Sequence, residues 1–277
     1  MRFTIWERIM KVEAPFFLIA GPCVIESEAL CMQIAQELVN LTQKYGIPYI
    51  FKASYRKDNR SRADSFTGIG DKEGLAVLQR VKERFHVRIL TDIHHPEDAS
   101  LAASYGVDIL QIPAFMCRQT SLLEAAAKTG KIVNVKKGQF LAPGQMQFVV
   151  DKLRHFGCDP AHMMLTERGT QFGYSDLIFD VRGIPEMKAL GVPVVMDVTH
   201  SLQQPNQEKG VTGGKPALIS TLATAAVSLG VDGLFIETHP HPAQALSDGA
   251  NMLPLDQMET LIQKLLPFRE AYLSTNK

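Results

Sequence analysis

Short apolar runs alternate with amphipathic stretches along the chain from residue 16 onward. The runs that predict strands are Phe16–Ala20, Tyr49–Phe51, Ile89–Leu90, Ile109–Leu110, Ile132–Val135, Met163–Leu165, Val192–Met196 and Leu234–Ile236. In the stretch Glu28–Tyr45, the residues Leu30, Ile34, Leu38 and Leu41 recur at close to helical spacing. Strands that alternate with helices in this way are typical of repeated βαβ units and a parallel sheet.

Later stretches of the chain repeat the helical pattern. Further helices are expected at Leu75–Phe85, Pro96–Tyr105, Thr120–Lys128, Gln145–Phe156, Ile184–Leu190, Pro216–Leu229 and Pro254–Leu273. The strands are apolar on both faces, as expected where helices cover one side and a barrel core fills the other. The pattern predicts an α/β chain with a single (β/α)8 TIM barrel domain over residues 1–277. Residues 1–15 do not fit the repeat, and we interpret them as a short N-terminal extension beneath the barrel floor.

Each predicted strand is followed by side chains that can take part in chemistry. These are Cys23, Lys52 and Lys57, Asp92 and His94, Gln111, Ala114 and Arg118, Lys136, Arg168, His200 and Glu237. A (β/α)8 barrel has its active site at the C-terminal ends of the strands, so this register predicts an enzyme. An open doubly wound sheet would also bind ligands there, but Gly21-Pro22-Cys23 is not the glycine-rich fingerprint expected after its first strand.

The composition excludes some partners. The 277 residues include 29 Lys and Arg against 29 Asp and Glu, so no overall basic field favours nucleic acid or a membrane surface. No apolar run approaches the roughly 20 residues that cross a bilayer. Four cysteines without tight pairing predict reduced thiols and a cytoplasmic location.

Basic residues gather at the predicted strand ends. They are Lys52, Lys57, Arg60, Arg118, Lys136, Lys137 and Arg168. Cations that converge on one rim of a barrel indicate a phosphorylated or multiply anionic substrate. The alternative is a scatter of solvated surface charges. Lys52 and Lys136 argue against it, because each directly continues an apolar strand toward the barrel mouth.

One further set of residues carries ligand types for a divalent metal ion. Cys23, His200, Glu237 and Asp248 offer a thiolate, an imidazole and two carboxylates, which suit Zn, Fe or Mn. The four lie on different units, but the first and last strands of a barrel are neighbours. The alternative interpretation is a buried thiol, a loop histidine and two solvated carboxylates, with Asp248 an ordinary turn residue.

Other polar groups allow two interpretations each. Asn59–Ser61 offers an amide, a guanidinium and a hydroxyl that would cradle phosphate oxygens. Asp92 either orients a substrate hydroxyl or satisfies loop amides. One of His94 and His95 is a candidate ligand or acid–base group, and the other is expected to be solvated. The polar segment Gln203–Gly214 is either a mobile lid over the site or a flexible connector.

Several local strings together resemble one family. They are Gly21–Ser27, Asn59–Ser61, Gln111–Phe115, Cys117–Thr120, Val133–Phe140, Thr166–Thr170, Asp197–Ser201 and Glu237–Pro240. In combination they resemble the 3-deoxy-D-manno-octulosonate 8-phosphate synthases over about residues 16–270. That resemblance implies a homotetrameric (β/α)8 barrel that condenses phosphoenolpyruvate with D-arabinose 5-phosphate and water. The products are the eight-carbon keto sugar acid phosphate and inorganic phosphate, a step toward lipopolysaccharide.

The resemblance also assigns roles to residues. Phosphoenolpyruvate would be held by Lys52, Lys57, Lys136 and Arg168, with Gln111 and Ala114 lining its pocket. The aldose would be held by Asn59, Arg60 and Ser61, with its phosphate reached by Arg118 of a neighbouring subunit. We expect the catalytic groups to be Lys52, Lys57, Asp92, His94, Lys136, Arg168 and His200. In the metal-dependent class a cysteine joins a histidine, a glutamate and an aspartate around one divalent ion, and this chain matches with Cys23, His200, Glu237 and Asp248.

One departure and two rival functions accompany this interpretation. The family usually has Phe-Asp-Lys-Ala-Asn-Arg where this chain has Tyr55-Arg56-Lys57-Asp58-Asn59-Arg60, which leaves the detail of aldose recognition open. The sister synthase that uses erythrose 4-phosphate shares the barrel and metal set, but typically carries Lys-Pro-Arg-Thr-Ser after its second strand. The other rival is a barrel that binds a sugar phosphate without turning it over.

Overall fold

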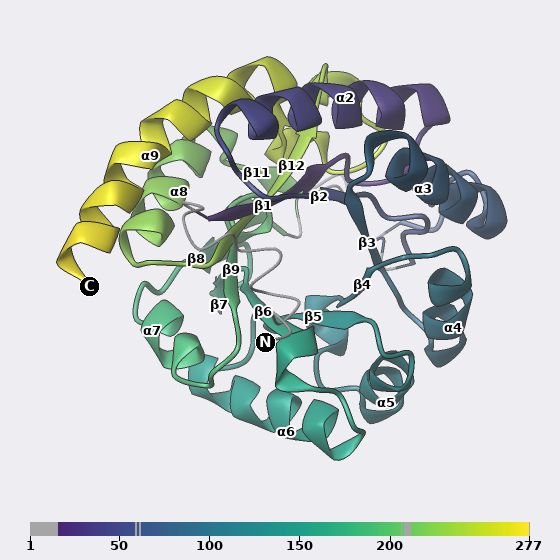
Figure 1. Cartoon of the computed structure of the whole chain (residues 1–277), viewed down its shortest axis with the longest axis horizontal. Helices are drawn as coiled ribbons and strands as arrows, with labels where there is room; N and C mark the ends of the chain where they lie inside the picture. Colours follow the sequence, from purple (N-terminus) through teal and green to yellow (C-terminus); the bar gives the residue numbers. More distant parts are fainter. Residues whose placement is uncertain (1–15, 59, 61, 206, 208–211, 277) are drawn as a thin grey trace.

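The computed structural model describes residues 16–58, 60, 62–205, 207 and 212–276. Eight parallel strands close into a barrel: β1 (Phe17–Gly21), β2 (Tyr49–Lys52), β3 (Arg88–Asp92), β4 (Ile109–Ile112), β5 (Ile132–Lys136), β6 (Met163–Glu167), β9 (Val194–Asp197) and β12 (Gly233–His239). Each strand pairs with the next in this order, and β12 pairs back to β1 in parallel. Figure 1 shows the helices as a ring around these strands. The predicted TIM barrel is confirmed, with all eight expected strands in place.

The expected helices are also confirmed. They are α2 (Glu28–Lys44), α3 (Asp71–Phe85), α4 (Pro96–Ser104), α5 (Thr120–Lys128), α6 (Gln147–His155), α7 (Gly183–Lys188), α8 (Ile219–Ser228) and α9 (Met258–Thr275). The expected N-terminal extension, residues 1–15, lies outside the described residues. No helix in the described part of the chain has the length and apolar composition that a membrane crossing requires.

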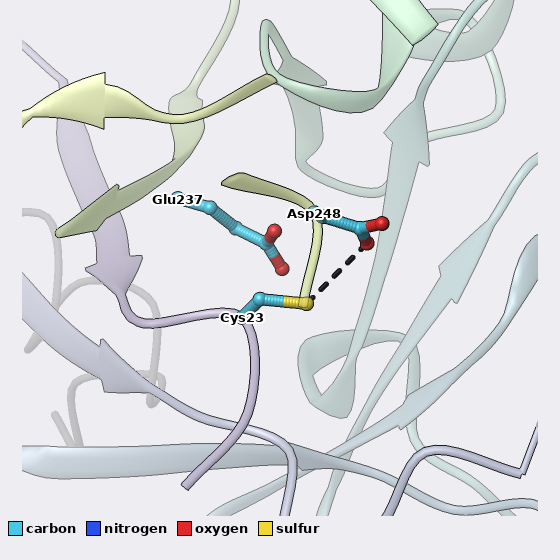
Figure 2. Close-up of side chains that lie close together, drawn as sticks. All are labelled: Cys23, Glu237 and Asp248. Carbon is cyan, nitrogen blue, oxygen red and sulfur yellow. Dashed lines mark hydrogen bonds between the residues drawn. The ribbon is translucent and has the colours of Figure 1, made fainter. Parts of the chain in front are cut away.

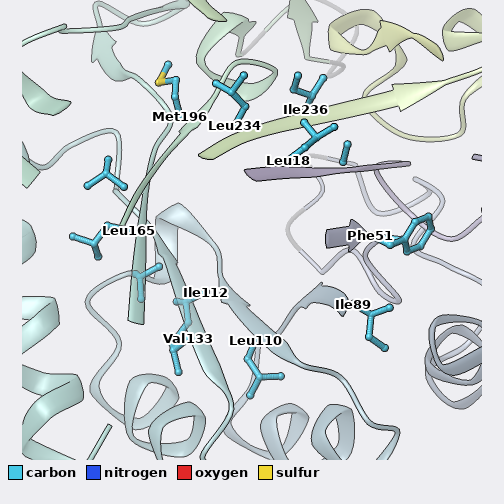
Figure 3. Packing of buried hydrophobic residues seen from close by; sticks show 14 of the residues in the cluster. Leu18, Phe51, Ile89, Leu110, Ile112, Val133, Leu165, Met196, Leu234 and Ile236 are labelled. Atoms are coloured by element: carbon cyan, nitrogen blue, oxygen red, sulfur yellow. The ribbon is translucent and has the colours of Figure 1, made fainter. Parts of the chain in front are cut away.

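Alternation along the strands divides the core into two layers. In β1, Phe17 and Ile19 belong to the cluster inside the barrel, whereas Leu18 and Ala20 pack in the layer between strands and helices. Figure 3 shows residues of this outer layer directed away from the barrel interior. The inner cluster is Phe17, Ile19, Ile50, Leu90, Ile109, Ile132, Met164, Val195 and Phe235. Most positions on both faces of the strands are therefore apolar, and the buried charged side chains of the strands lie at or near their C-terminal ends.

Short strands not expected from the sequence extend the loops at the C-terminal side. A hairpin of β7 (Thr170–Phe172) and β8 (Asp176–Ile178) follows β6, and β13 (Leu253–Pro254) pairs with the end of β12. Within the predicted lid, β10 (Gln203–Gln204) pairs with β11 (Gly213–Gly214), so the two ends of that segment are held together. Residues 206 and 208–211 of the lid lie outside the described residues, and its motion stays a prediction.

Candidate active site

Four of the predicted basic side chains are buried at the C-terminal ends of the strands. Lys52 ends β2, Lys136 ends β5, Arg168 follows β6, and Lys57 lies in the loop after β2. Their exposed fractions are 1% for Lys52, 6% for Lys136, 5% for Arg168 and 7% for Lys57. Burying four cations at one mouth is costly unless anions compensate them. Buried carboxylates compensate three of them, Glu237 for Lys52, Asp92 for Lys57 and Asp197 for Lys136. Arg168 keeps Nη1 without a hydrogen-bond partner in the described part of the chain, so this arginine is open to an anion. The four cations are therefore not a solvated rim.

Three of the four predicted metal ligands lie together in the folded chain. Ligand atoms of Cys23, Glu237 and Asp248 are all within 4.8 Å of one another (Figure 2). The pairing of β1 with β12 explains this proximity. It sets Gly21 opposite Glu237, and Cys23 follows Gly21 by two residues. His200 completes the set from a third direction, since its Nε2 lies 3.6 Å from Glu237 Oε2 and 3.9 Å from Asp248 Oδ2.

The donor set fits a divalent cation. Glu237 Oε1 lies 2.5 Å from Lys52 Nζ, whereas the buried Oε2 has no hydrogen-bond partner in the described part of the chain. Burial alone would raise the pKa of Glu237, but the positive charges of the neighbouring lysines, Lys52 above all, bring it down to about 2. An ionised carboxylate oxygen without a partner, beside a thiol and an imidazole, is the arrangement expected of a metal ligand.

Asp197 orients the histidine of this set. Its Oδ2 lies 2.8 Å from His200 Nδ1 and accepts a hydrogen bond from Lys136 Nζ at 2.7 Å, while Oδ1 accepts the backbone N–H of His200. With Nδ1 held by the carboxylate, Nε2 faces Glu237 and Asp248. A carboxylate behind a histidine fixes the ring and its tautomer in many metal sites. Asp197 is the last residue of the seventh barrel strand, but the sequence alone did not indicate that it belongs to the site.

A chain of polar side chains crosses the barrel below the mouth. Ser54 donates to Asp92 Oδ2 at 2.6 Å, Gln111 donates to Asp92 Oδ1, and Asn134 donates to Gln111 Oε1 at 2.9 Å. Thr166 then donates to Asn134 Oδ1 at 2.8 Å. Asp92 and Gln111 were expected in the site, whereas the other three were not. The network fixes the side chain of Gln111, which limits how it can turn toward a ligand.

Two predicted site residues keep buried nitrogen atoms without partners. Three buried nitrogen atoms have no hydrogen-bond partner among the described residues. They are the two ring nitrogens of His94 and Nη1 of Arg168. Arg168 Nη2 donates to Gln203 Oε1 at 2.5 Å, which links this arginine to the base of the predicted lid. Burial lowers the pKa of His94 despite the nearby Asp92 carboxylate. Buried polar atoms left open in this way are available to a ligand.

The predicted aldose-binding segment is described only in part. Asn59 and Ser61 lie outside the described residues. Arg60 Nη1 lies 2.8 Å from Ser247 Oγ and 3.2 Å from Asp248 Oδ1, so it borders the metal ligands. A cavity of about 750 Å³ opens beside Arg60, Ser247 and Asp248. Ser247 Oγ also lies 3.0 Å from the Cys23 sulfur, and nothing in the sequence indicated that this residue belongs to the site.

The remaining predicted residues have different surroundings. Ala114 is buried in a short 3-10 turn after β4, next to the mouth. Arg118 is exposed, and its backbone carbonyl accepts from Lys152 Nζ at 2.9 Å, so its role across a subunit boundary stays a prediction. Lys137 does not join the other cations. Its buried ammonium contacts the carbonyls of Gly138, Leu141 and Gly169 and lies 3.5 Å from Glu167.

Comparison with known proteins agrees with this geometry. A model described as "DAHP synthetase I family" matches residues 8–272. The chain is 52% identical over 257 residues to a 2-dehydro-3-deoxyphosphooctonate aldolase of Cyanothece sp., covering 93% of each chain. It is 50% identical to a protein of the same name from Polaromonas sp. over 256 residues, which is 91% of this chain and 90% of the relative. That name is a synonym of the synthases that the sequence motifs resemble. The chain therefore belongs to the DAHP synthetase I family and, within it, to the group named 2-dehydro-3-deoxyphosphooctonate aldolase.

Proposed function

We propose that this enzyme condenses phosphoenolpyruvate with D-arabinose 5-phosphate and water to give 3-deoxy-D-manno-octulosonate 8-phosphate and inorganic phosphate, in lipopolysaccharide synthesis. The observation that carries the proposal is the set of buried cations at the mouth beside Cys23, His200, Glu237 and Asp248. Two phosphates and a carboxylate on the substrates require such a cluster. The name shared by the relatives supports this reaction over the sister synthase, and the intact site argues against a non-catalytic binder.

In this proposal the lysines and Arg168 bind phosphoenolpyruvate. Lys57 and Lys136 hold their ammonium groups against Asp92 and Asp197, at 3.4 and 2.7 Å, so both are fixed before substrate arrives. Arg168 keeps one guanidinium nitrogen open for a phosphate or carboxylate oxygen. Positioning of this kind holds the attacking carbon in line with the aldehyde.

We further propose one divalent ion per subunit, Zn, Fe or Mn, held by Cys23, His200, Glu237 and Asp248. Bound there, the ion would supply a Lewis acid that orients the aldehyde or the attacking water. Lys52 offsets the charge of Glu237, and Asp197 holds His200 in the tautomer that leaves Nε2 free. Burial and the neighbouring Glu237 raise the pKa of the Cys23 thiol, so its deprotonation depends on a bound cation.

The assembly and location are part of the same proposal. Arg60, with Asn59 and Ser61, would bind the aldose, and Arg118 of a neighbouring subunit would reach its phosphate. Phe115, three residues before Arg118, is 66% exposed in the single chain, so the surface beside Arg118 is open to a neighbouring subunit of the proposed homotetramer. All four cysteines are buried and free of disulfides in the described structure, which supports a cytoplasmic location for a single-domain barrel.

The test is phosphate release from phosphoenolpyruvate plus arabinose 5-phosphate. We expect release from metal-replete protein, loss after a strong chelator, and recovery when a divalent metal is restored. Release that survives verified metal removal would keep the reaction and reject the ion as essential. No release from metal-replete protein would overturn the proposal, and erythrose 4-phosphate would then be the substrate to try.

A further inference from the structure

Three consecutive residues after β2 contact the segment that runs from the last residue of β3 to the first turn of α4. The two oxygens of Asp98 both lie 2.7 Å from Arg56 Nη2. Lys57 Nζ lies 3.4 Å from Asp92 Oδ2, and Asp58 Oδ2 lies 2.8 Å from His95 Nε2. The contacts of Arg56 and Asp58, called here the loop clamp, lie on either side of Lys57.

The clamp is anchored in the fold at its Arg56 end. Asp98 is 3% exposed, and its Oδ2 accepts the backbone N–H groups of His94 and His95, both at 2.9 Å. Arg56 Nη1 also lies 2.5 Å from Asp71, the first residue of α3. One guanidinium thus joins the loop after β2 to the N-terminal turns of two helices. A forked contact of this kind fixes direction as well as distance.

Both clamp residues stand where this chain departs from the family string. That string has an aspartate at the position of Arg56 and an alanine at the position of Asp58. An aspartate at 56 would meet the carboxylates of Asp71 and Asp98, and an alanine at 58 makes no contact with His95. The clamp therefore depends on the two residues that distinguish this chain.

We propose that Arg56 and Asp58 are positioning residues for the aldose, an inference that rests on the proposed function. Arg60 follows Asp58 by two residues. The clamp therefore fixes the position of the backbone from which the segment with Arg60 begins. Lys57 has its own anchors, because its side chain meets Asp92 and its backbone N–H donates to the Thr67 carbonyl at 2.8 Å. Loss of the clamp should thus weaken aldose binding more than phosphoenolpyruvate binding.

The test compares Asp58→Ala, His95→Ala and the double variant in steady-state kinetics with both substrates. We expect the KM for arabinose 5-phosphate to rise about three- to tenfold in each single variant, as loss of one such contact predicts. The double variant should be no worse than the poorer single one, because Asp58 acts through His95. The KM for phosphoenolpyruvate should change less than about twofold.

Two further variants complete the design. Arg56→Ala should raise the KM for arabinose 5-phosphate in the same way. Arg56→Lys should raise it less, because the lysine keeps the positive charge that pairs with Asp71 and Asp98. Arg62→Ala is the matched control, because among the described residues the Arg62 side chain pairs with Asp64 alone, 2.5 Å away in the same loop, and both side chains are exposed. That control should keep wild-type kinetics, and thermal unfolding should show that all variants fold.

The outcomes separate the two proposals. If the wild type turns over both substrates but the clamp variants keep the wild-type KM for arabinose 5-phosphate, the positioning role is overturned and the proposed function stands. An equal rise in both KM values would overturn its restriction to the aldose, and additive effects of Asp58→Ala and His95→Ala would overturn the coupling between them. No turnover by the wild type would overturn the proposed function and this inference with it.

Discussion

At the residue scale, Cys23 shows how position changes the chemistry of a side chain. The chain has four buried cysteines, and among the described residues only Cys23 belongs to a cluster of three side chains that could hold a metal ion. Its thiol donates to Asp248 Oδ2 at 3.4 Å and lies 3.0 Å from Ser247 Oγ. The other three cysteines lie on or beside helices and loops away from that cluster. We therefore assign chemistry to one thiol and packing to three.

Replacing Cys23 by Ser tests that assignment. A serine hydroxyl is a much poorer ligand at neutral pH, because it does not ionise as a thiol does beside a cation. We expect metal affinity and kcat/KM to fall together, each by about tenfold or more. Metal content after dialysis and phosphate release measure the two quantities.

The matched control is Cys158→Ser. Cys158 is also buried, but its sulfur lies 3.8 Å from the carbonyls of Asp159 and His162 and has no carboxylate or imidazole of the proposed metal site beside it. This variant should keep both metal and turnover. Full metal content and wild-type turnover in Cys23→Ser would remove Cys23 from the ligand set.

At the scale of secondary structure, the loops after β5 and β6 are joined by a buried ion pair. Lys137 and Glu167 are 0% and 2% exposed, and Glu167 Oε1 accepts the backbone N–H groups of Arg168 and Gly169 at 2.9 and 2.7 Å. The pair therefore holds the backbone from which the Arg168 side chain extends. In the sequence Lys137 was grouped with the cations at the strand ends, but of the two adjacent lysines only Lys136 was expected to continue its strand into the mouth.

We expect Glu167→Gln to destabilise the protein by about 3 kcal/mol, because it leaves the Lys137 ammonium buried without its countercharge. The double variant Lys137→Met with Glu167→Gln should recover part of that loss. Urea unfolding of the single and double variants measures both. Equal stability of wild type and Glu167→Gln would show that the carbonyl oxygens around Lys137 suffice to hold it.

The barrel strands could be predicted from the sequence because each contains an apolar run between two helical patterns, and the helices because each is long enough to show its period. The strands β7, β8, β10, β11 and β13 could not, because two or three residues have no recognisable alternation. Among the site residues, those that follow a strand were predicted for the same positional reason. Ser54, Asn134 and Thr166 were not, since a small polar residue in or beside a strand does not indicate which neighbour it will bond.

At the scale of the whole molecule, the site as proposed is shared between subunits, and complementation tests this. Arg118→Ala and Lys136→Ala should each be nearly inactive, because one removes the contact with the aldose phosphate and the other a contact with phosphoenolpyruvate. Mixed tetramers of the two variants should regain part of the wild-type activity, since some sites then receive both intact residues.

Phosphate release before and after subunit exchange measures the recovery, and mass spectrometry of labelled subunits confirms that exchange has occurred. Tetramers of one variant alone, treated identically, are the control. Confirmed exchange without recovered activity would contradict a site that spans two subunits.

The closure of the barrel by β1 and β12 also has a consequence for synthesis of the chain. Cys23 and Asp248 are 225 positions apart, so Cys23 emerges from the ribosome roughly 10–45 s before Asp248 at about 5–20 residues per second. During that interval the thiol has neither its carboxylate neighbours nor its burial. The proposed metal ion can therefore be bound by all four residues only after translation has passed β12 and the loop that carries Asp248.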